Sequence, residues 1–106
     1  MIYLTNSTFL PCNGTWKMST VDLNFAQDLV ENSFISAVGH SSTAEVISTL
    51  LGVEVPVNRI SLYDLEVDTQ ILCFKLKERA PEGVILSKEE IEEIGYEWKL
   101  LTLCQK

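Results

Sequence analysis

A short apolar segment, a Gly-His turn and a helix-forming segment follow one another in the middle of the chain, and this succession constrains the fold more than any other feature. Residues 34–38 (FISAV) predict a strand that ends at Gly39-His40. Directly after this turn, apolar side chains recur at helical spacing, which predicts a helix over about residues 43–51. A strand, a tight turn and a helix N-terminus form the arrangement in which α/β proteins present reactive groups.

The predicted helix has clear start and stop signals. Ser42, with Glu45 three residues later, matches the capping-box pattern, and Gly52 is placed to end the helix. The first backbone N–H groups of a helix have no intrahelical partner and lie at the positive end of the helix dipole. An anion is therefore favoured at this point.

His40, the only histidine of the chain, would stand beside such an anion. Imidazole is the side chain best able to donate a proton near neutral pH, and a phosphate next to it favours its charged form. The pattern indicates a phosphate site that carries a proton donor. The alternative is a loop histidine whose ring is satisfied within the fold.

Strand and helix patterns alternate along the rest of the chain. Ser87 and Glu90 form a second capping-box pattern before a helix that stops at Gly95, and a shorter helical stripe covers residues 25–30. Further strands are expected over residues 2–5, 16–23, 59–62, 69–76 and 96–103. We therefore predict one domain over residues 1–106 of the α/β (α+β) class, with a mixed sheet flanked by a few short helices and with residues 69–76 as a central strand.

Composition limits the classes of partner. The net charge of −7 argues against a protein that coats long nucleic acid, because such binding depends on Lys and Arg neutralising many phosphates. A small anionic ligand stays possible, since Lys75, Lys77 and Arg79 are close together in the sequence. That cluster predicts either a local positive pocket or the solvated face of an alternating strand.

The cysteines and the hydropathy pattern indicate a cytoplasmic protein. Three widely separated cysteines, Cys12, Cys73 and Cys104, fit neither a disulfide framework nor a zinc motif. We expect Cys73 and Cys104 to be buried and Cys12 to be exposed. No signal peptide or membrane-spanning segment is expected. With 106 residues, the chain is small enough that dimerisation would add useful buried area.

Four segments carry a resemblance to a known family: residues 4–6 (LTN), 37–43 (AVGHSST), 57–59 (VNR) and 79–87 (RAPEGVILS). The most specific pieces are the Gly-His-x-Ser-Thr helix start and the Arg-x-x-Glu-Gly loop before a Leu-Ser helix cap. In order and spacing across nearly the whole chain, the sequence resembles the viral ring nuclease family of type III anti-CRISPR proteins, which occurs in archaeal viruses, phages and mobile elements.

The resemblance implies a function and a set of site residues. Proteins of this family form homodimers around cyclic tetra-adenylate and cleave it without metal or cofactor, which silences the type III CRISPR effectors that it activates. The expected products are linear di-adenylates with 2′,3′-cyclic phosphate ends. By position, the resemblance implies catalytic roles for His40, Glu82 and Arg79, and ligand binding by Asn6, Gly39, Ser41, Ser42, Thr43 and Arg59.

Two other classes of function stay open from the sequence. One is a mobile-element protein that sequesters the cyclic nucleotide without cutting it, or that binds DNA. The other is an interaction domain whose strand over residues 96–103 pairs across a dimer edge.

Overall fold

The fold, known from a computed structural model, is described for residues 2–6, 12–63, 65–78 and 87–106. Helices and strands alternate along these ranges, as the sequence patterns predict. Their order is β1 (Ile2–Thr5), β2 (Thr15–Val21), α1 (Leu23–Val30), β3 (Ile35–Ser36), α2 (Ser41–Leu51), β4 (Gln70–Leu76), α3 (Lys88–Ile94) and β5 (Tyr96–Gln105).

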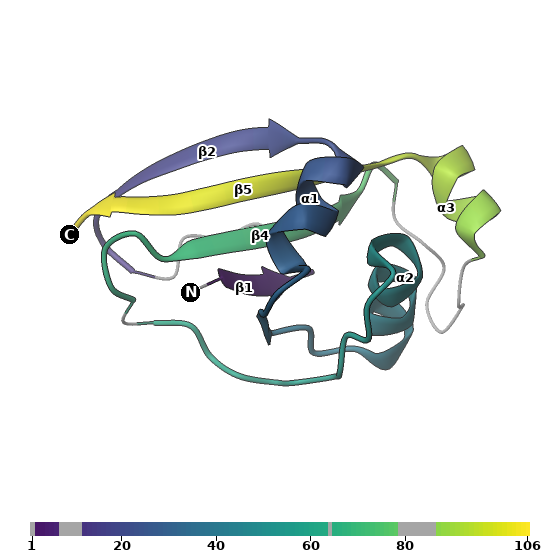
Figure 1. The fold of residues 1–106 in the computed structure, drawn as a ribbon, viewed down its shortest axis with the longest axis horizontal. Helices are drawn as coiled ribbons and strands as arrows, with labels where there is room; N and C mark the ends of the chain where they lie inside the picture. The colour runs from purple at the N-terminus through teal and green to yellow at the C-terminus, as the bar shows by residue number, and fades with distance from the viewer. Residues whose placement is uncertain (1, 7–11, 64, 79–86) are drawn as a thin grey trace.

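The described strands form one mixed sheet in the order β2-β5-β4-β1-β3 (Figure 1). Strand β1 pairs in parallel with both β3 and β4, whereas β5 runs antiparallel to β4 and to β2. The predicted α/β (α+β) class is therefore confirmed. Figure 1 shows α1 and α2 on the same face of the sheet.

Strand β4 is buried on both of its faces. Leu72 and Phe74 belong to an apolar cluster on the helix side of the sheet, while Ile71 and Cys73 belong to a second cluster on the opposite side. Neighbouring side chains of a strand point to opposite faces, so the near-continuous apolar run of β4 requires cover on both sides. This confirms the prediction of a central strand in this region.

The two faces of the sheet are covered by different means. Helix α2 is the main contributor to the helix-side cluster, with α1 and α3 supplying fewer buried residues. The opposite cluster receives Leu62 and Leu65 from the irregular segment that follows α2. The segment between α2 and β4 therefore serves as part of the core, although it contains no described helix or strand.

Two of the three helices in the described residues begin with side-chain caps. Ser87 and Glu90 form the predicted capping box of α3, and Gly95, with φ of 88°, follows the helix as predicted. At α1, Asp22 accepts a hydrogen bond of 2.8 Å from the backbone N–H of Phe25.

Helix α2 begins differently from the prediction. It starts at Ser41, with His40 at the N-cap position and no side-chain cap hydrogen bond. The predicted Ser42–Glu45 capping box is therefore wrong, because Ser42 already lies in the first turn. The first helical hydrogen bond runs from the Ala44 N–H to the His40 carbonyl at 2.9 Å. The predicted end at Gly52 is confirmed by its left-handed backbone, with φ of 71°.

Two strand predictions need correction. The strand expected over residues 34–38 is reduced to β3, and residues 59–62 form no strand. The main-chain N–H of Ile60 donates to the carbonyl of Asn58, two residues earlier, which is a tight local turn rather than a ladder contact. Arg59, Ile60 and Ser61 are exposed.

One of the alternatives left open by the sequence placed the strand over residues 96–103 at a dimer edge. Strand β5 instead lies between β2 and β4, so it is not an edge strand of the described sheet. Cys104, expected to be buried, is exposed because it lies in the last two residues of β5, where burial ends. Cys73 is buried as predicted, and Cys12 is half-buried rather than exposed. None of the helices in the described ranges has the length and hydropathy needed to cross a bilayer.

Candidate functional site

Two parallel strands bring the first site residues together. Strands β1 and β3 pair with Leu4 opposite Ser36, and the Ala37 N–H donates to the Leu4 carbonyl at 2.8 Å. Parallel strands end at the same edge of a sheet, which is where α/β folds place their ligands. Asn6, one residue beyond β1, therefore lies beside the turn that leads from β3 into α2.

A second segment, residues 58–59, packs against the turn over residues 37–40 that leads from β3 into α2. Arg59 donates a hydrogen bond from Nε to the Gly39 carbonyl at 2.9 Å. The backbone N–H of Asn58 donates to the Val38 carbonyl, and its side-chain Nδ2 donates to the Ser36 carbonyl, both at 2.8 Å. These contacts fix the segment against the turn through one main-chain donor and two side-chain donors.

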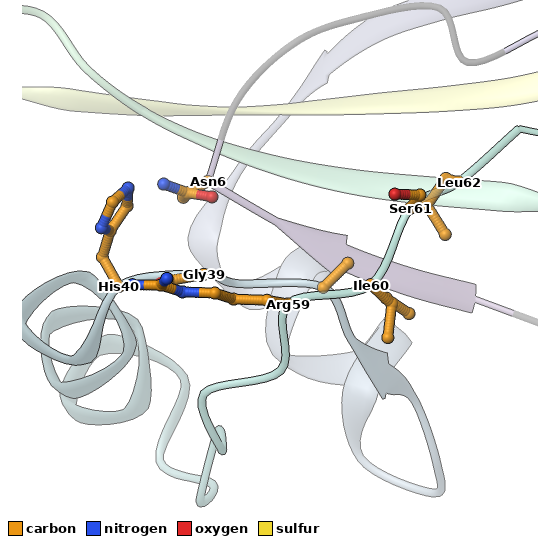
Figure 2. A pocket seen from close by; sticks show the side chains of 8 residues that line it. Asn6, Gly39, His40, Arg59, Ile60, Ser61 and Leu62 are labelled. Carbon is orange, nitrogen blue, oxygen red and sulfur yellow. The ribbon is translucent and has the colours of Figure 1, made fainter.

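The turn and this segment border an open pocket of about 330 Å³. Figure 2 shows the His40 imidazole and the Asn6 carboxamide on the same side of the pocket, with the Arg59 side chain running past Gly39 toward His40. His40 and Arg59 are exposed, and Asn6 and Gly39 are partly buried. The lining residues are Asn6, Ala37, Gly39, His40, Arg59, Ile60, Ser61 and Leu62.

The chemistry of the pocket favours an anion. The His40 side chain does not cap α2, so it does not occupy the first N–H groups of the helix. Arg59 uses Nε for the Gly39 carbonyl, and its terminal nitrogens form no hydrogen bond or ion pair with any other described residue. A guanidinium and an imidazole are thus available at the pocket, and the first N–H groups of α2 follow directly after His40, outside the pocket lining.

The structure brings together four of the predicted site residues: Asn6, Gly39, His40 and Arg59. Ser42 and Thr43 lie in the first turn of α2 and do not line this pocket, while the Ser41 side chain lines a different groove beside Glu45. Arg79 and Glu82 lie outside the described residues. Over the described ranges, no group of three or more His, Cys, Asp or Glu side chains is arranged to hold a metal ion.

Sequence reasoning missed Asn58 and the apolar residues that follow it. Asn58 lies within one of the segments that carry the family resemblance, but only Arg59 was predicted from that segment as a site residue. The available signal was the residue type, because Asn side chains commonly bond to main-chain groups in loops.

Comparison with known proteins places the chain among viral and bacterial relatives. Residues 2–98 match the family described as STIV B116-like. Protein 26 of Sulfolobus islandicus filamentous virus (isolate Iceland/Hveragerdi), which is uncharacterised, is 39% identical over 102 residues, covering 91% of this chain and 86% of that protein. The uncharacterised protein YddF of Bacillus subtilis (strain 168) is 31% identical over 104 residues, covering 95% of each chain.

A solved structure supports the fold. B116 of Sulfolobus turreted icosahedral virus superposes with a TM-score of 0.77 at 22% sequence identity, covering 95% of this chain and 97% of that chain. At this identity the likeness concerns the fold alone. It agrees with the mixed sheet and helices described above.

No side chain caps the start of α2, where His40 is the N-cap residue. We therefore predict that the protein is less stable with His40 than with a capping residue at this position. Replacing the N-cap residue in His40→Ser supplies an oxygen that accepts from the first-turn N–H groups, and we expect the free energy of unfolding to rise by about 0.5–1 kcal/mol. Urea denaturation at pH 7 measures the change. The matched control is Ser87→Ala, which removes an existing cap from α3 and should lower the same free energy by about 1 kcal/mol. A destabilised His40→Ser variant would contradict the assignment of His40 as a non-capping residue.

Proposed function

Because the chain belongs to the STIV B116-like family, we propose that it is a metal-independent phosphodiesterase that cleaves cyclic tetra-adenylate, and that the His40 pocket is its active site. The observation that carries the proposal is the position of the only histidine in the chain. His40 lies at the uncapped N-terminus of α2, beside Arg59 and Asn6. The viral relatives are consistent with a role against a host defence.

The proposed reaction is an internal transesterification. The ribose 2′-oxygen attacks the adjacent phosphorus, the bond from phosphorus to the 5′-oxygen breaks, and a 2′,3′-cyclic phosphate forms. His40 donates a proton to the departing 5′-oxygen, and the 2′-hydroxyl releases one to solvent, so no water is consumed. Holding the 2′-oxygen in line with the leaving group is the main task of the protein.

The remaining roles follow from charge. Arg59 holds the phosphoryl oxygens, whose negative charge increases in the transition state. Arg79 is proposed to offset the charge on the same phosphoryl oxygens, and Glu82 is proposed to orient the His40 imidazole. Two cuts at opposite positions of the ring release two linear di-adenylates.

A twofold dimer fits the size of the ligand. The pocket of one chain, at about 330 Å³, is at the lower end of the range for small-molecule sites, and four nucleotide units exceed it. Three large apolar side chains on the segment that borders the pocket are exposed: Val57 by 47%, Ile60 by 40% and Tyr63 by 73%. Neighbouring exposed apolar side chains mark interaction surfaces, and a second copy would cover these while adding a second His40.

One assay distinguishes the proposal from the open alternatives. Radiolabelled cyclic tetra-adenylate is incubated with the protein in EDTA and resolved on denaturing and native gels. Cleavage to di-adenylates supports the proposed enzyme. A stable shift without cleavage indicates sequestration, and neither result indicates an interaction protein.

We predict that His40→Ala lowers the cleavage rate by about 10²-fold or more, because a general acid contributes about 10²–10⁴-fold. The dissociation constant for the cyclic ligand should change by only a few-fold, since proton donation acts on the transition state. Single-turnover kinetics and equilibrium titration measure the two quantities. Glu45→Gln, on the exposed side of the same helix, is the control and should cleave normally. Loss of binding in parallel with activity would refute the general-acid role.

We predict that Arg59→Ala weakens ligand binding by about 10- to 100-fold at low salt, the equivalent of one charge-assisted contact of about 1.5–3 kcal/mol. The deficit should shrink as salt rises, because screening weakens the wild-type contact. Titration at two salt concentrations measures it. Lys17→Ala removes an exposed cation from the edge strand β2 and should leave the affinity unchanged. Equal losses in both variants would indicate a non-specific charge effect.

We predict a homodimer in which each site draws residues from both chains. Light scattering should give twice the monomer mass at micromolar concentration. Mixing inactive His40→Ala with inactive Arg79→Ala protomers should then restore part of the activity, because one site of the heterodimer receives both intact residues. A mixture that stays inactive would place His40 and Arg79 of each site in one chain, and a monomer would exclude the shared site.

A further inference from the structure

The sheet does not hold the turn that carries His40. Strand β3 contains two residues, and among the residues that the structure describes, the hydrogen bond from the Ala37 N–H to the Leu4 carbonyl joins the start of this turn to β1. Helix α2 begins at Ser41. The backbone from Val38 to His40 therefore lies between the end of the sheet and the start of the helix, and its position must be set by other contacts.

Asn58 supplies one of those contacts and a second contact to the strand residue just before the turn. Its main-chain N–H donates to the Val38 carbonyl and its side-chain Nδ2 donates to the Ser36 carbonyl, each at 2.8 Å. The two acceptors flank Ala37, so a single residue holds the backbone on both sides of the point where the chain leaves the sheet. The buried Ser36 hydroxyl adds to the same junction by donating to the Pro56 carbonyl at 2.6 Å.

We propose that Asn58 is a positioning residue for His40. It does not line the pocket. It acts by fixing the peptide groups of Ser36 and Val38, and these determine the direction in which the chain presents the imidazole two residues later. The effect on catalysis rests on the proposed function, whereas the effect on the orientation of His40 does not.

The side-chain donor is the essential feature. A carboxamide can donate to a carbonyl, while the isosteric carboxylate of Asp has no proton to donate and would place negative charge against the Ser36 oxygen. Displacing a catalytic group by about 1 Å costs on the order of 10²-fold in rate. Asn58→Asp and Asn58→Ala should thus share one defect, although only Ala changes the size of the side chain.

Helix α2 provides a matched control at its opposite end. Gln27 donates from Nε2 to the Leu50 carbonyl at 3.1 Å, which is the same kind of bond, from a half-buried side-chain amide to a main-chain oxygen. Gln27→Ala removes a comparable contact from α2 without touching the His40 turn. A loss of stability alone would affect Gln27→Ala and the Asn58 variants alike.

The single histidine makes the orientation directly observable. The imidazole carbon-bound protons of His40 give one set of signals in a ¹H–¹³C correlation spectrum, with no other histidine to confuse them. We expect these signals to shift or broaden in Asn58→Asp and Asn58→Ala and to keep their wild-type positions in Gln27→Ala. With cyclic tetra-adenylate, kcat should fall about tenfold or more in the Asn58 variants while KM changes little.

The outcomes separate the two proposals. Unchanged His40 signals in a folded Asn58 variant would overturn the positioning role, whatever the activity. Shifted signals together with a wild-type protein that does not cleave would retain the positioning role and refute the proposed function. If both Asn58 variants fail to fold while Gln27→Ala folds, Asn58 has a purely structural role and the inference is overturned.

Discussion

The arrangement of the site depends on the parallel pairing of β1 with its two neighbours. This strand has four residues, but it joins β4 on one side and β3 on the other. Because all three run in one direction, their carboxyl ends share an edge, and Asn6 and the turn that carries His40 meet there. The buried side chain of Leu4 fixes β1 in the core, so this edge is anchored from within. A slip of one residue in this register would reverse the faces of every side chain in β1 and separate Asn6 from the pocket.

Helix α2 buries one face in the core, but no side chain caps the backbone N–H groups of its first turn. Five of its residues are buried, including Ile47 and Leu50, so tertiary packing holds the helix in place without help from a cap. That packing allows a histidine at a position where Ser, Thr, Asp or Asn is preferred. The N–H groups that a capping side chain would occupy then stay available to a ligand. Helix α3, which takes no part in the pocket, carries the conventional capping box.

Local patterns predicted the regular elements well and the irregular ones poorly. Strand β4 and the helix after Ser87 follow from side-chain periodicity and capping chemistry, both of which act over a few residues. The segment over residues 59–62 has a strand-like pattern, but Asn58 and Arg59 bond to a turn about 20 residues earlier in the sequence, and no local pattern encodes such a pairing. The start of α2 was misplaced for the same reason, since contacts from Asn58 and Arg59 rather than a cap define the turn before it. Of the predicted site residues in the described ranges, Asn6, Gly39, His40 and Arg59 line one pocket, whereas Ser41, Ser42 and Thr43 do not line it. Asn58 acts from outside the strand, turn and helix that the sequence pattern predicts.

The proposed function requires a chain with a net charge of −7 to bind an anion. The field of the whole protein does not attract phosphate, and it is screened beyond about 10 Å at ordinary ionic strength. Recognition must therefore come from donors in direct contact with the ligand. Main-chain N–H groups at a helix start are neutral donors with fixed direction, so they bind a phosphate without adding positive charge to the surface. Arg59 adds one cation, already oriented by the Gly39 carbonyl, at the place where it is useful. Such a site favours a compact ligand that reaches the donors over a long polyanion, whose distant phosphates would meet the acidic surface.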